Sequence, residues 1–288
     1  MRSMKLAVLA DIHSNHHALK ACISHALEKN ADEFLFLGDY VSDCPCPQKT
    51  MQIIYEMRKK YRCHFIRGNR EDYMLNHREN PDEGWTYCSA SGNLLYTYEN
   101  LKEEDFLFYK SLDIQGMYQK EGYPVFRYCH GSPASSKELL IPENENVVSI
   151  MENLDVDLLV SGHTHIQNAA VYGNKRLIHP GSVGIPWYYE GKSQYMILHG
   201  KEDGWEEEFF QIDYNVKDVI KEFEESGLNG KSFYWAKLNI HALSTGEDVT
   251  TPCLKLAIKL CKEGEGSVTW PDIPEKYWKA AAESFGII

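Results

Sequence analysis

Short apolar runs alternate with amphipathic segments through the first two thirds of the chain. The runs with the length and content of buried strands are residues 6–10, 33–37, 62–66, 125–129 and 158–160. Residues 16–30 and 48–60 carry apolar side chains at helical spacing between the first three runs. This β-α-β-α-β alternation predicts an α/β fold in which helices cover the faces of a layered sheet.

The pattern changes after residue 165. Residues 169–172 and 175–178 flank Gly173-Asn174 and predict a hairpin, and residues 195–199 and 205–212 predict two more strands. From about Asn215 the apolar residues recur at helical spacing, first over 216–223, then over 254–261 and 275–285.

We therefore predict one unit over residues 1–212 and a helical C-terminal extension over residues 213–288. The extension carries no recognisable ligand motif. We interpret it as a packing element, with a dimerisation element or a substrate-closing element as the alternatives.

Each of the five apolar runs leads into a residue that can bind a metal ion. These residues are Asp11, His13, Asp39, Asn69, His130, His163 and His165. Open α/β sheets gather their ligands beyond the carboxyl ends of the strands, so we expect these side chains to converge at one rim. Carboxylate, amide and imidazole groups together suit a divalent metal ion. The simpler alternative is a set of hydrogen-bonded polar residues at strand ends.

The motifs Asp11-x-His13, Gly38-Asp39, Gly68-Asn69, His130-Gly131 and Gly162-His163-x-His165 resemble those of the calcineurin-like metallophosphoesterases. The resemblance spans roughly residues 1–212. It implies a four-layer α-β-β-α sandwich and a dinuclear metal centre. It also implies that Asp11, His13 and His165 hold one ion, that Asn69, His130 and His163 hold the other, and that Asp39 bridges them.

Two ions about 3.5–4 Å apart can clamp the attacking and leaving oxygens of an in-line displacement. With only Asp11 and Asp39 to offset two divalent ions, the site keeps a charge of about +2, which attracts phosphate and acidifies a bound water. The expected reaction is hydrolysis of a phosphodiester or phosphoanhydride, with Asp39, His130 and Arg70 in catalytic roles. Mn, Fe or Zn each suit these ligands, and the sequence does not choose among them.

The chain departs from the family pattern at Arg70, where many members have a histidine that protonates the leaving oxygen. Arginine stays charged and cannot supply that proton, but it can bind phosphoryl oxygens through two hydrogen bonds. We therefore expect a leaving group that needs little help from an acid, such as a nucleotide or an aryl group, rather than an alkyl monoester. His16, His17 or His64 are alternative proton donors, and Arg70 as a surface ion-pair residue is the alternative for that side chain.

Residues 71–112 predict a helical, cap-like excursion rich in aromatic side chains. Most of these should form the core of the excursion, whereas Trp85 and Tyr87 are candidates for stacking on a base. The stretch Thr97-Tyr-Glu-Asn-Leu101 and the acidic helix after it resemble the bacterial diadenosine tetraphosphatase-like branch, which implies a dinucleoside polyphosphate substrate. His179-Pro-Gly-Ser resembles a loop that usually begins with Asn, so His179 either contacts substrate or holds the turn.

The charge composition of the chain limits the kinds of binding partner to be expected. The 288 residues carry a formal net charge of −12, which disfavours long nucleic acid as the main partner and a nuclease function. A small, nucleotide-like phosphorylated substrate remains compatible with this charge because the site itself is positive.

We find no apolar run of membrane-spanning length and no signal segment, so we expect a cytoplasmic protein without membrane contact. A homo-oligomer is possible. A phosphomonoesterase or protein phosphatase, and a non-catalytic interaction module on the same fold, are the other functions considered.

The chain has eight cysteines, which an intracellular protein of this size would not use as a disulfide framework. Cys44-Pro-Cys46-Pro follows Asp39 and should lie near the site. We interpret it as a proline-stiffened loop with incidental thiols. A thiolate metal site or a redox switch is the alternative.

Overall fold

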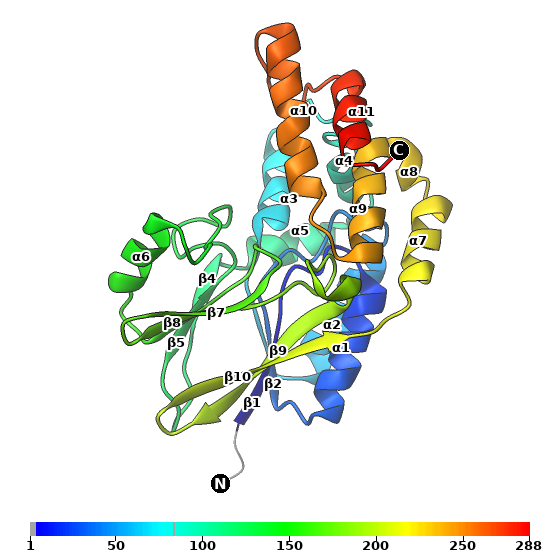
Figure 1. Ribbon diagram of the computed structural model, residues 1–288. Helices are drawn as coiled ribbons and strands as arrows, with labels where there is room; N and C mark the ends of the chain where they lie inside the picture. The colour runs from blue at the N-terminus through cyan, green and yellow to red at the C-terminus, as the bar shows by residue number, and fades with distance from the viewer. Residues whose placement is uncertain (1–3, 83) are drawn as a thin grey trace.

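The computed structural model describes residues 4–82 and 84–288 of the chain (Figure 1). Two five-stranded sheets form its centre. The first has the order β10-β9-β1-β2-β3, with bounds Gly204–Ile212, Ser193–Lys201, Met4–Leu9, Glu33–Phe36 and Cys63–Phe65. The second has the order β4-β5-β6-β8-β7, with bounds Gln115–Tyr118, Phe126–Cys129, Leu158–Ser161, Lys175–Pro180 and Gln167–Tyr172.

Strand β1 shows how the layers are built. Its alternate residues Leu6 and Val8 enter an apolar core shared with the second sheet, which contributes residues such as Phe126. Ala7 and Leu9 point the other way, into a core shared with α1 (His16–Glu28) and α2 (Pro47–Lys60). All of these residues are buried.

The second sheet is covered on its outer side by α6 (Glu145–Glu152). Val147 and Met151 of this helix pack on Leu159 and Leu177 of the sheet. Helices, sheet, sheet and helix therefore follow one another, which confirms the predicted α-β-β-α sandwich.

Further helices stand at the end of the sandwich where β1 and β2 finish (Figure 1). Between β3 and β4 these are α3 (Asn69–Glu79), α4 (Gly92–Glu99) and α5 (Glu103–Lys110). After β10 they are α7 to α11, with bounds Val216–Glu225, Leu228–Lys231, Phe233–Thr245, Thr250–Glu265 and Glu275–Ser284. The two groups touch: Gly92 lies so close to the backbone of Lys231 that a Cβ there would overlap it. Among the described residues, no helix combines the length and apolar character needed to cross a membrane.

Strand β4 and helix α9 are among the elements that the sequence analysis did not predict. Strand β4 lies at a sheet edge and buries only Tyr118 of its four residues, so it lacks the alternation that marks a strand. Helix α9 buries residues on several sides, among them Tyr234, Leu238 and Asn239, so it lacks a single apolar stripe.

Candidate metal centre

The loops that follow β1, β2, β5 and β6, together with the first turn of α3, meet at one end of the sandwich. They carry all seven predicted metal ligands. Asp11, His13, Asp39, Asn69 and His130 are buried, whereas His163 and His165 are half-buried at the mouth of the site.

The first group of ligands contains Asp11, His13 and His165. One ligand atom from each lies within 4.8 Å of the others. The Nε2 atoms of His13 and His165 are 3.0 Å apart, and His165 Nε2 lies 3.8 Å from Asp11 Oδ1. His165 Nδ1 donates a hydrogen bond to the carbonyl of Ile185 at 2.6 Å. Since that bond fixes the proton on Nδ1, His165 can present the lone pair of Nε2 to a metal ion.

The second group contains Asp39, His130 and His163, with the same 4.8 Å limit between their ligand atoms. Asn69 belongs to it as well, because its Oδ1 lies 3.0 Å from His130 Nε2. His130 Nδ1 donates to the carbonyl of Leu37 at 2.7 Å, so its Nε2 faces the centre as in His165.

Asp39 lies between the two groups. Its Oδ2 is 3.7 Å from His13 Nε2 in the first group, and its Oδ1 is 3.4 Å from His130 Nε2 in the second. The backbone amide of Arg70 also donates to Oδ1, at 2.8 Å, and orients the carboxylate. One carboxylate thus reaches both groups, as a bridging ligand must.

The backbone at these residues is strained. Positive φ angles occur at five predicted ligands: Asp11 (54°), His13 (48°), Asp39 (52°), His163 (76°) and His165 (61°). Each such conformation costs a residue other than glycine about 1–3 kcal/mol, and such residues cluster at functional sites. The concentration of strain here supports a functional site independently of the motifs.

Comparison with known proteins agrees with this geometry. The calcineurin-like phosphoesterase family matches residues 4–167, more than half of the chain. The chain belongs to the calcineurin-like phosphoesterase family. It is accordingly a phosphoester hydrolase, and its clustered His and Asp side chains fit the metal dependence of this family.

Individual relatives are similar over most of the chain. An uncharacterised protein of Methanocaldococcus jannaschii is 27% identical over 240 residues, which are 77% of this chain and 93% of the relative. The crystal structure of a hypothetical protein from Pyrococcus horikoshii has a TM-score of 0.71 and 21% identity, and covers 85% of this chain and 99% of that one. A metallophosphoesterase from Sphaerobacter thermophilus has a TM-score of 0.66 and 20% identity, and covers 85% of this chain and 100% of that one. At these identities the two structures show the fold.

In this phosphoesterase site, the pKa values of the two carboxylates Asp11 and Asp39 are shifted in opposite directions. Burial raises the pKa of Asp11 to about 6, and the nearby charge of Asp39 raises it too. Burial also opposes ionisation of Asp39, but His130, His13 and Arg70 lower its pKa well below the usual range. Burial disfavours the charged form of His130, yet Asp39 and Asp11 raise its pKa to about 9. Without a metal ion, Asp39 and His130 therefore form a buried ion pair.

His163 and His165 behave in the opposite way. Burial, with the charge of His130, lowers the pKa of His163 to about 3, and burial with His13 lowers the pKa of His165 well below its ordinary value. Both rings are neutral at ordinary pH, which is the form that binds metal.

Asp43 is a member of the site that the sequence analysis missed. Its Oδ2 lies 2.9 Å from His13 Nδ1 and 3.0 Å from Arg70 Nη2. Its Oδ1 accepts hydrogen bonds from Trp235 Nε1 at 2.7 Å and from Asn93 Nδ2 at 3.1 Å. Burial opposes its charge, but Arg70 and His13 lower its pKa below the usual range. This carboxylate joins a predicted ligand to the C-terminal helices. Its place four residues after Asp39 was the available signal.

Arg70 lies at the edge of the centre. Its side chain is only 20% exposed, and it pairs with buried Asp43, so the surface ion-pair alternative does not describe it. The three other proton-donor candidates lie elsewhere. His16 and His17 approach Glu222, and His64 approaches Glu33 on β2.

Of the other residues singled out in the sequence, His179 and Trp85 lie at or beside the site, whereas Tyr87 does not line the cleft. His179 is buried and holds the turn, because the backbone amides of Thr164 and Gly181 point at its two ring nitrogens at 3.0 and 2.9 Å. A neutral imidazole has one acceptor nitrogen, so it satisfies one of these amides at a time. Trp85 lines the cleft described next and stacks on His77 with a ring separation of 4.0 Å. Tyr87 is exposed and donates to Glu99 instead.

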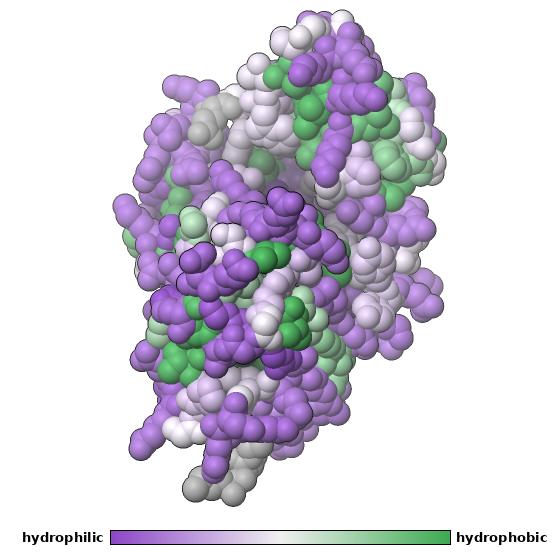
Figure 2. Space-filling view, turned by 60° about the vertical axis from the view of Figure 1, so that its left-hand side comes forward, coloured by the Kyte–Doolittle hydropathy of each residue, from purple (hydrophilic) through white to green (hydrophobic). Residues whose placement is uncertain are grey.

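A cleft of about 760 Å³ opens beside the centre. Figure 2 shows a hollow beneath the C-terminal helices at the top of the molecule. The ligands Asn69 and His163 lie in the cleft, with Arg70 next to them. The C-terminal helices and their linkers supply Trp235, Thr251, Leu254 and Trp270 to its wall. The extension is therefore more than a packing element, because it closes one side of the cleft.

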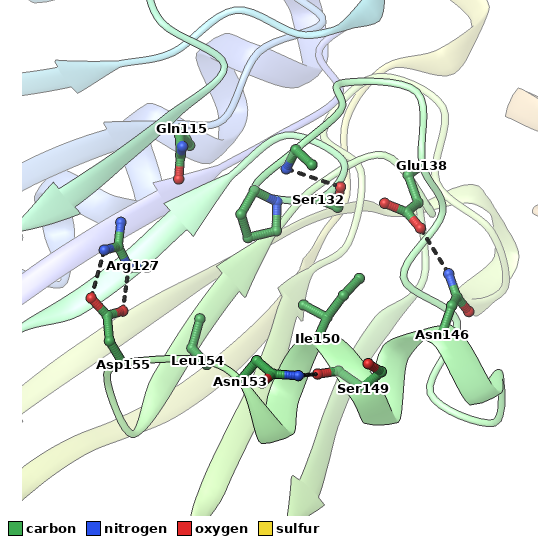
Figure 3. Close-up of a pocket in the computed structure, with 12 residues that line it drawn as sticks. Gln115, Arg127, Ser132, Glu138, Asn146, Ser149, Ile150, Asn153, Leu154 and Asp155 are labelled. Atoms are coloured by element: carbon green, nitrogen blue, oxygen red, sulfur yellow. Dashed lines mark hydrogen bonds and ion pairs between the residues drawn. The ribbon is translucent and has the colours of Figure 1, made fainter.

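A second cavity of about 760 Å³ lies by α6 (Figure 3). Its lining includes Glu138 and an ion pair between Arg127 and Asp155. None of the seven predicted ligands lines it, so we place the chemistry in the cleft.

Proposed function

We propose that this phosphoesterase is a dinuclear hydrolase that cleaves phosphodiester or phosphoanhydride bonds in small, nucleotide-like substrates. The observation that carries the proposal is the position of Asp39, whose two oxygens face imidazoles of two separate ligand groups. The donor set fits two divalent ions such as Mn, Fe or Zn, because carboxylate, amide and imidazole groups are ligand types that these ions accept. Asp11 and Asp39 offset only about half of the charge of two divalent ions. When bound, two such ions supply the charge that activates water and stabilises the phosphoryl oxygens.

Arg70 would bind the phosphoryl group from the cleft side. Burial disfavours its charge, but Asp43 and Asp39 raise its pKa above the ordinary value, so the guanidinium stays charged. Asp43 Oδ2 lies 3.0 Å from Arg70 Nη2 and fixes the guanidinium next to the predicted ligand Asn69. The other guanidinium N–H groups are left to bind the phosphoryl oxygens. A positioned, partly buried guanidinium stabilises charge that develops on phosphoryl oxygens.

The cleft favours a good leaving group. Among its described lining residues, those with a titratable side chain are Arg70, Tyr73, Lys137 and His163. Arg70 does not release its proton, and His163 is a predicted ligand whose pKa is lowered to about 3, so among the described lining residues no imidazole is free to act as the general acid. A nucleotide or aryl leaving group needs no general acid, whereas an alkoxide does.

The walls favour a substrate with a flat group. Tyr73, Trp85, Trp235 and Trp270 all line the cleft, and the ring of Tyr73 carries the Lys137 ammonium 4.8 Å from its centre. Aromatic side chains beside a cationic phosphate site are typical of nucleotide recognition. This supports a dinucleoside polyphosphate, such as diadenosine tetraphosphate, as the substrate class. The C-terminal wall also restricts access for a phosphoserine on a folded protein.

The test is product analysis after incubation of the Mn-loaded protein with diadenosine tetraphosphate, beside bis-p-nitrophenyl phosphate and an alkyl phosphomonoester. We expect nucleotide products from the first, hydrolysis of the second, and little turnover of the third. AMP with ATP would mean off-centre attack, and two ADP would mean central attack. Activity on the aryl diester alone would support the proposed metal chemistry but would exclude a dinucleoside polyphosphate as the substrate. Preferential hydrolysis of the alkyl monoester would contradict the leaving-group argument.

A further inference from the structure

A third group of metal-binding side chains lies apart from the two groups of the catalytic centre. It consists of His16 at the start of α1, Cys46 just before α2, and Glu222 on α7. Ligand atoms of these residues lie within 4.8 Å of one another. The group shares no residue with the catalytic centre, and none of its members lines the cleft.

The side chains of Cys46, His16, His17 and Lys49 converge on the Glu222 carboxylate. His16 Nε2 lies 3.0 Å from Oε1, Lys49 Nζ 2.6 Å, and His17 Nε2 3.4 Å. The ring centres of His16 and His17 lie 4.0 Å apart, and the ring planes are tilted by 35° to each other. His17 Nε2 is buried and has no hydrogen-bond partner, so a polar atom is directed at the carboxylate without a bond to satisfy it.

The donor set is that of a zinc site. Thiolate, imidazole and carboxylate are the three ligand types of protein-bound zinc. In a tetrahedral site with ordinary zinc–ligand distances, the ligand atoms stand about 3.3–3.6 Å apart. The 3.0 Å between His16 and Glu222 and the 3.4 Å between His17 and Glu222 lie within a few tenths of an ångström of that spacing.

The ionisation of the group is compatible with a metal ion. Burial raises the pKa of Cys46 to about 12, and the charge of Glu222 raises it further, so the thiol is protonated in the metal-free protein. A divalent ion supplies the positive charge that ionises it, and the thiol proton leaves to solvent. Burial opposes the charge of Glu222, but Lys49 and His16 lower its pKa to about 2, so the carboxylate is ionised. Lys49 is 57% exposed along its side chain and can turn toward solvent when an ion takes its place.

We propose that His16, Cys46 and Glu222 form a separate binding site for a divalent ion of the zinc class, with His17 as the fourth ligand. Four protein ligands and no open position make this a structural site. The ion would join α7 of the C-terminal helices to α1 and α2 of the sandwich. It would thereby fix the helices that carry Trp235 and lead to Trp270 in the cleft wall.

The test uses cobalt in place of zinc. The metal-stripped, full-length protein is titrated with Co(II), and the thiolate-to-cobalt charge-transfer absorption is recorded for wild type, Cys46→Ser and the matched control Cys63→Ser. Cys63 is half-buried like Cys46 and its pKa is also raised to about 12, but it belongs to no ligand group. The catalytic ligands include no sulfur, so this absorption reports the third site alone, whatever happens at the catalytic centre.

We expect the band in wild type and Cys63→Ser, its loss in Cys46→Ser, and one fewer bound ion per chain in that variant. A wild type without the band, or a band that survives in Cys46→Ser, would overturn the proposal. Should Cys46→Ser fail to fold, Glu222→Gln serves instead. Loss of a metal ligand should weaken cobalt binding by at least the roughly 10–100-fold that loss of an outer-shell partner costs. Unchanged affinity in Glu222→Gln would contradict the site.

Discussion

The cleft has two parts that are built in different ways: a floor, which carries the seven predicted ligands, and a wall, which carries Trp235, Thr251, Leu254 and Trp270 of the C-terminal extension. The floor consists of short loops after strands and the first turn of α3, where five predicted ligands are buried, His163 and His165 are half-buried, and five of the seven have a positive φ. The wall contributed by the C-terminal helices consists of half-buried or exposed side chains, such as Trp235 and Trp270, on ordinary helices and linkers. We therefore expect the floor to fix the chemistry and the wall to select the substrate. Rigid, strained positions suit metal ligands, whereas exposed aromatic side chains suit recognition.

The largest effect is expected on the floor, from Asp39→Asn. The amide keeps the size of the side chain but removes the charge that would bridge two ions, so kcat should fall by roughly 10³-fold, about 4 kcal/mol in activation free energy. Steady-state hydrolysis of bis-p-nitrophenyl phosphate measures it. Asp155→Asn, at the cavity by α6, is the matched control and should keep full activity. An Asp39→Asn enzyme within about tenfold of wild type would contradict the bridging role.

Asp43→Asn tests the junction of floor and wall. The substitution keeps the shape but weakens the contacts with His13 and Arg70, both within 3.0 Å of Oδ2. Since Asp43 supports a ligand rather than acting as one, metal affinity should fall by roughly 10–100-fold, and excess metal should restore much of the activity. Titration of activity with Mn gives both values. Unaltered metal dependence would show that Asp43 serves only the wall.

Trp270→Ala tests the wall alone. This side chain is 48% exposed and lines the cleft, so its loss should not disturb the fold. Stacking on a base contributes about 1–3 kcal/mol, so KM for a dinucleoside polyphosphate should rise roughly tenfold while kcat changes little. The small substrate bis-p-nitrophenyl phosphate should be affected less. Phe285→Ala, at a partly exposed aromatic outside the cleft lining, is the control. An equal loss on both substrates would argue against selective recognition by the wall.

The smallest expected effect is the release of a proton when the protein binds a metal ion. The pKa of His130 is raised from 6.5 to about 9 in the metal-free protein, so near neutral pH the ring is protonated and must lose a proton to bind a metal ion. Metal binding should therefore release protons near neutral pH, and the part of the release due to His130 should disappear above about pH 9. Calorimetric titrations in buffers of different ionisation enthalpy measure this release. A release that does not change between pH 7 and pH 10 would contradict the combination of a raised pKa and a ligand role for His130.

The sequence predicted the floor far better than the wall. Strands β1 and β2 contain the apolar runs 6–9 and 34–36, and Asp11 and Asp39 follow within three residues of the strand ends, so local pattern alone could place both at the rim of the sheet. The contact between Asp43 and Trp235 joins residues 192 positions apart. No local pattern contains such a contact.

For a related reason, the sequence analysis gave a substrate-closing role for the C-terminal extension only as an alternative and did not assign the residues of the wall. Helix α9, which carries Trp235, is enclosed on several sides and shows no amphipathic stripe. Trp270 stands in a linker whose sequence has no periodicity. Its place in the cleft follows from how α10 and α11 pack together, which depends on the whole C-terminal core rather than on the residues beside it.

The claim on which the proposed function depends is that Asp39 bridges two ions. Electron paramagnetic resonance of the Mn-loaded protein tests it directly, because two Mn(II) ions that share a carboxylate are magnetically coupled and isolated ions are not. We predict a coupled-pair spectrum that grows with added Mn in the wild type and is lost in Asp39→Asn. A wild-type spectrum of isolated ions at full loading and full activity would contradict the dinuclear centre.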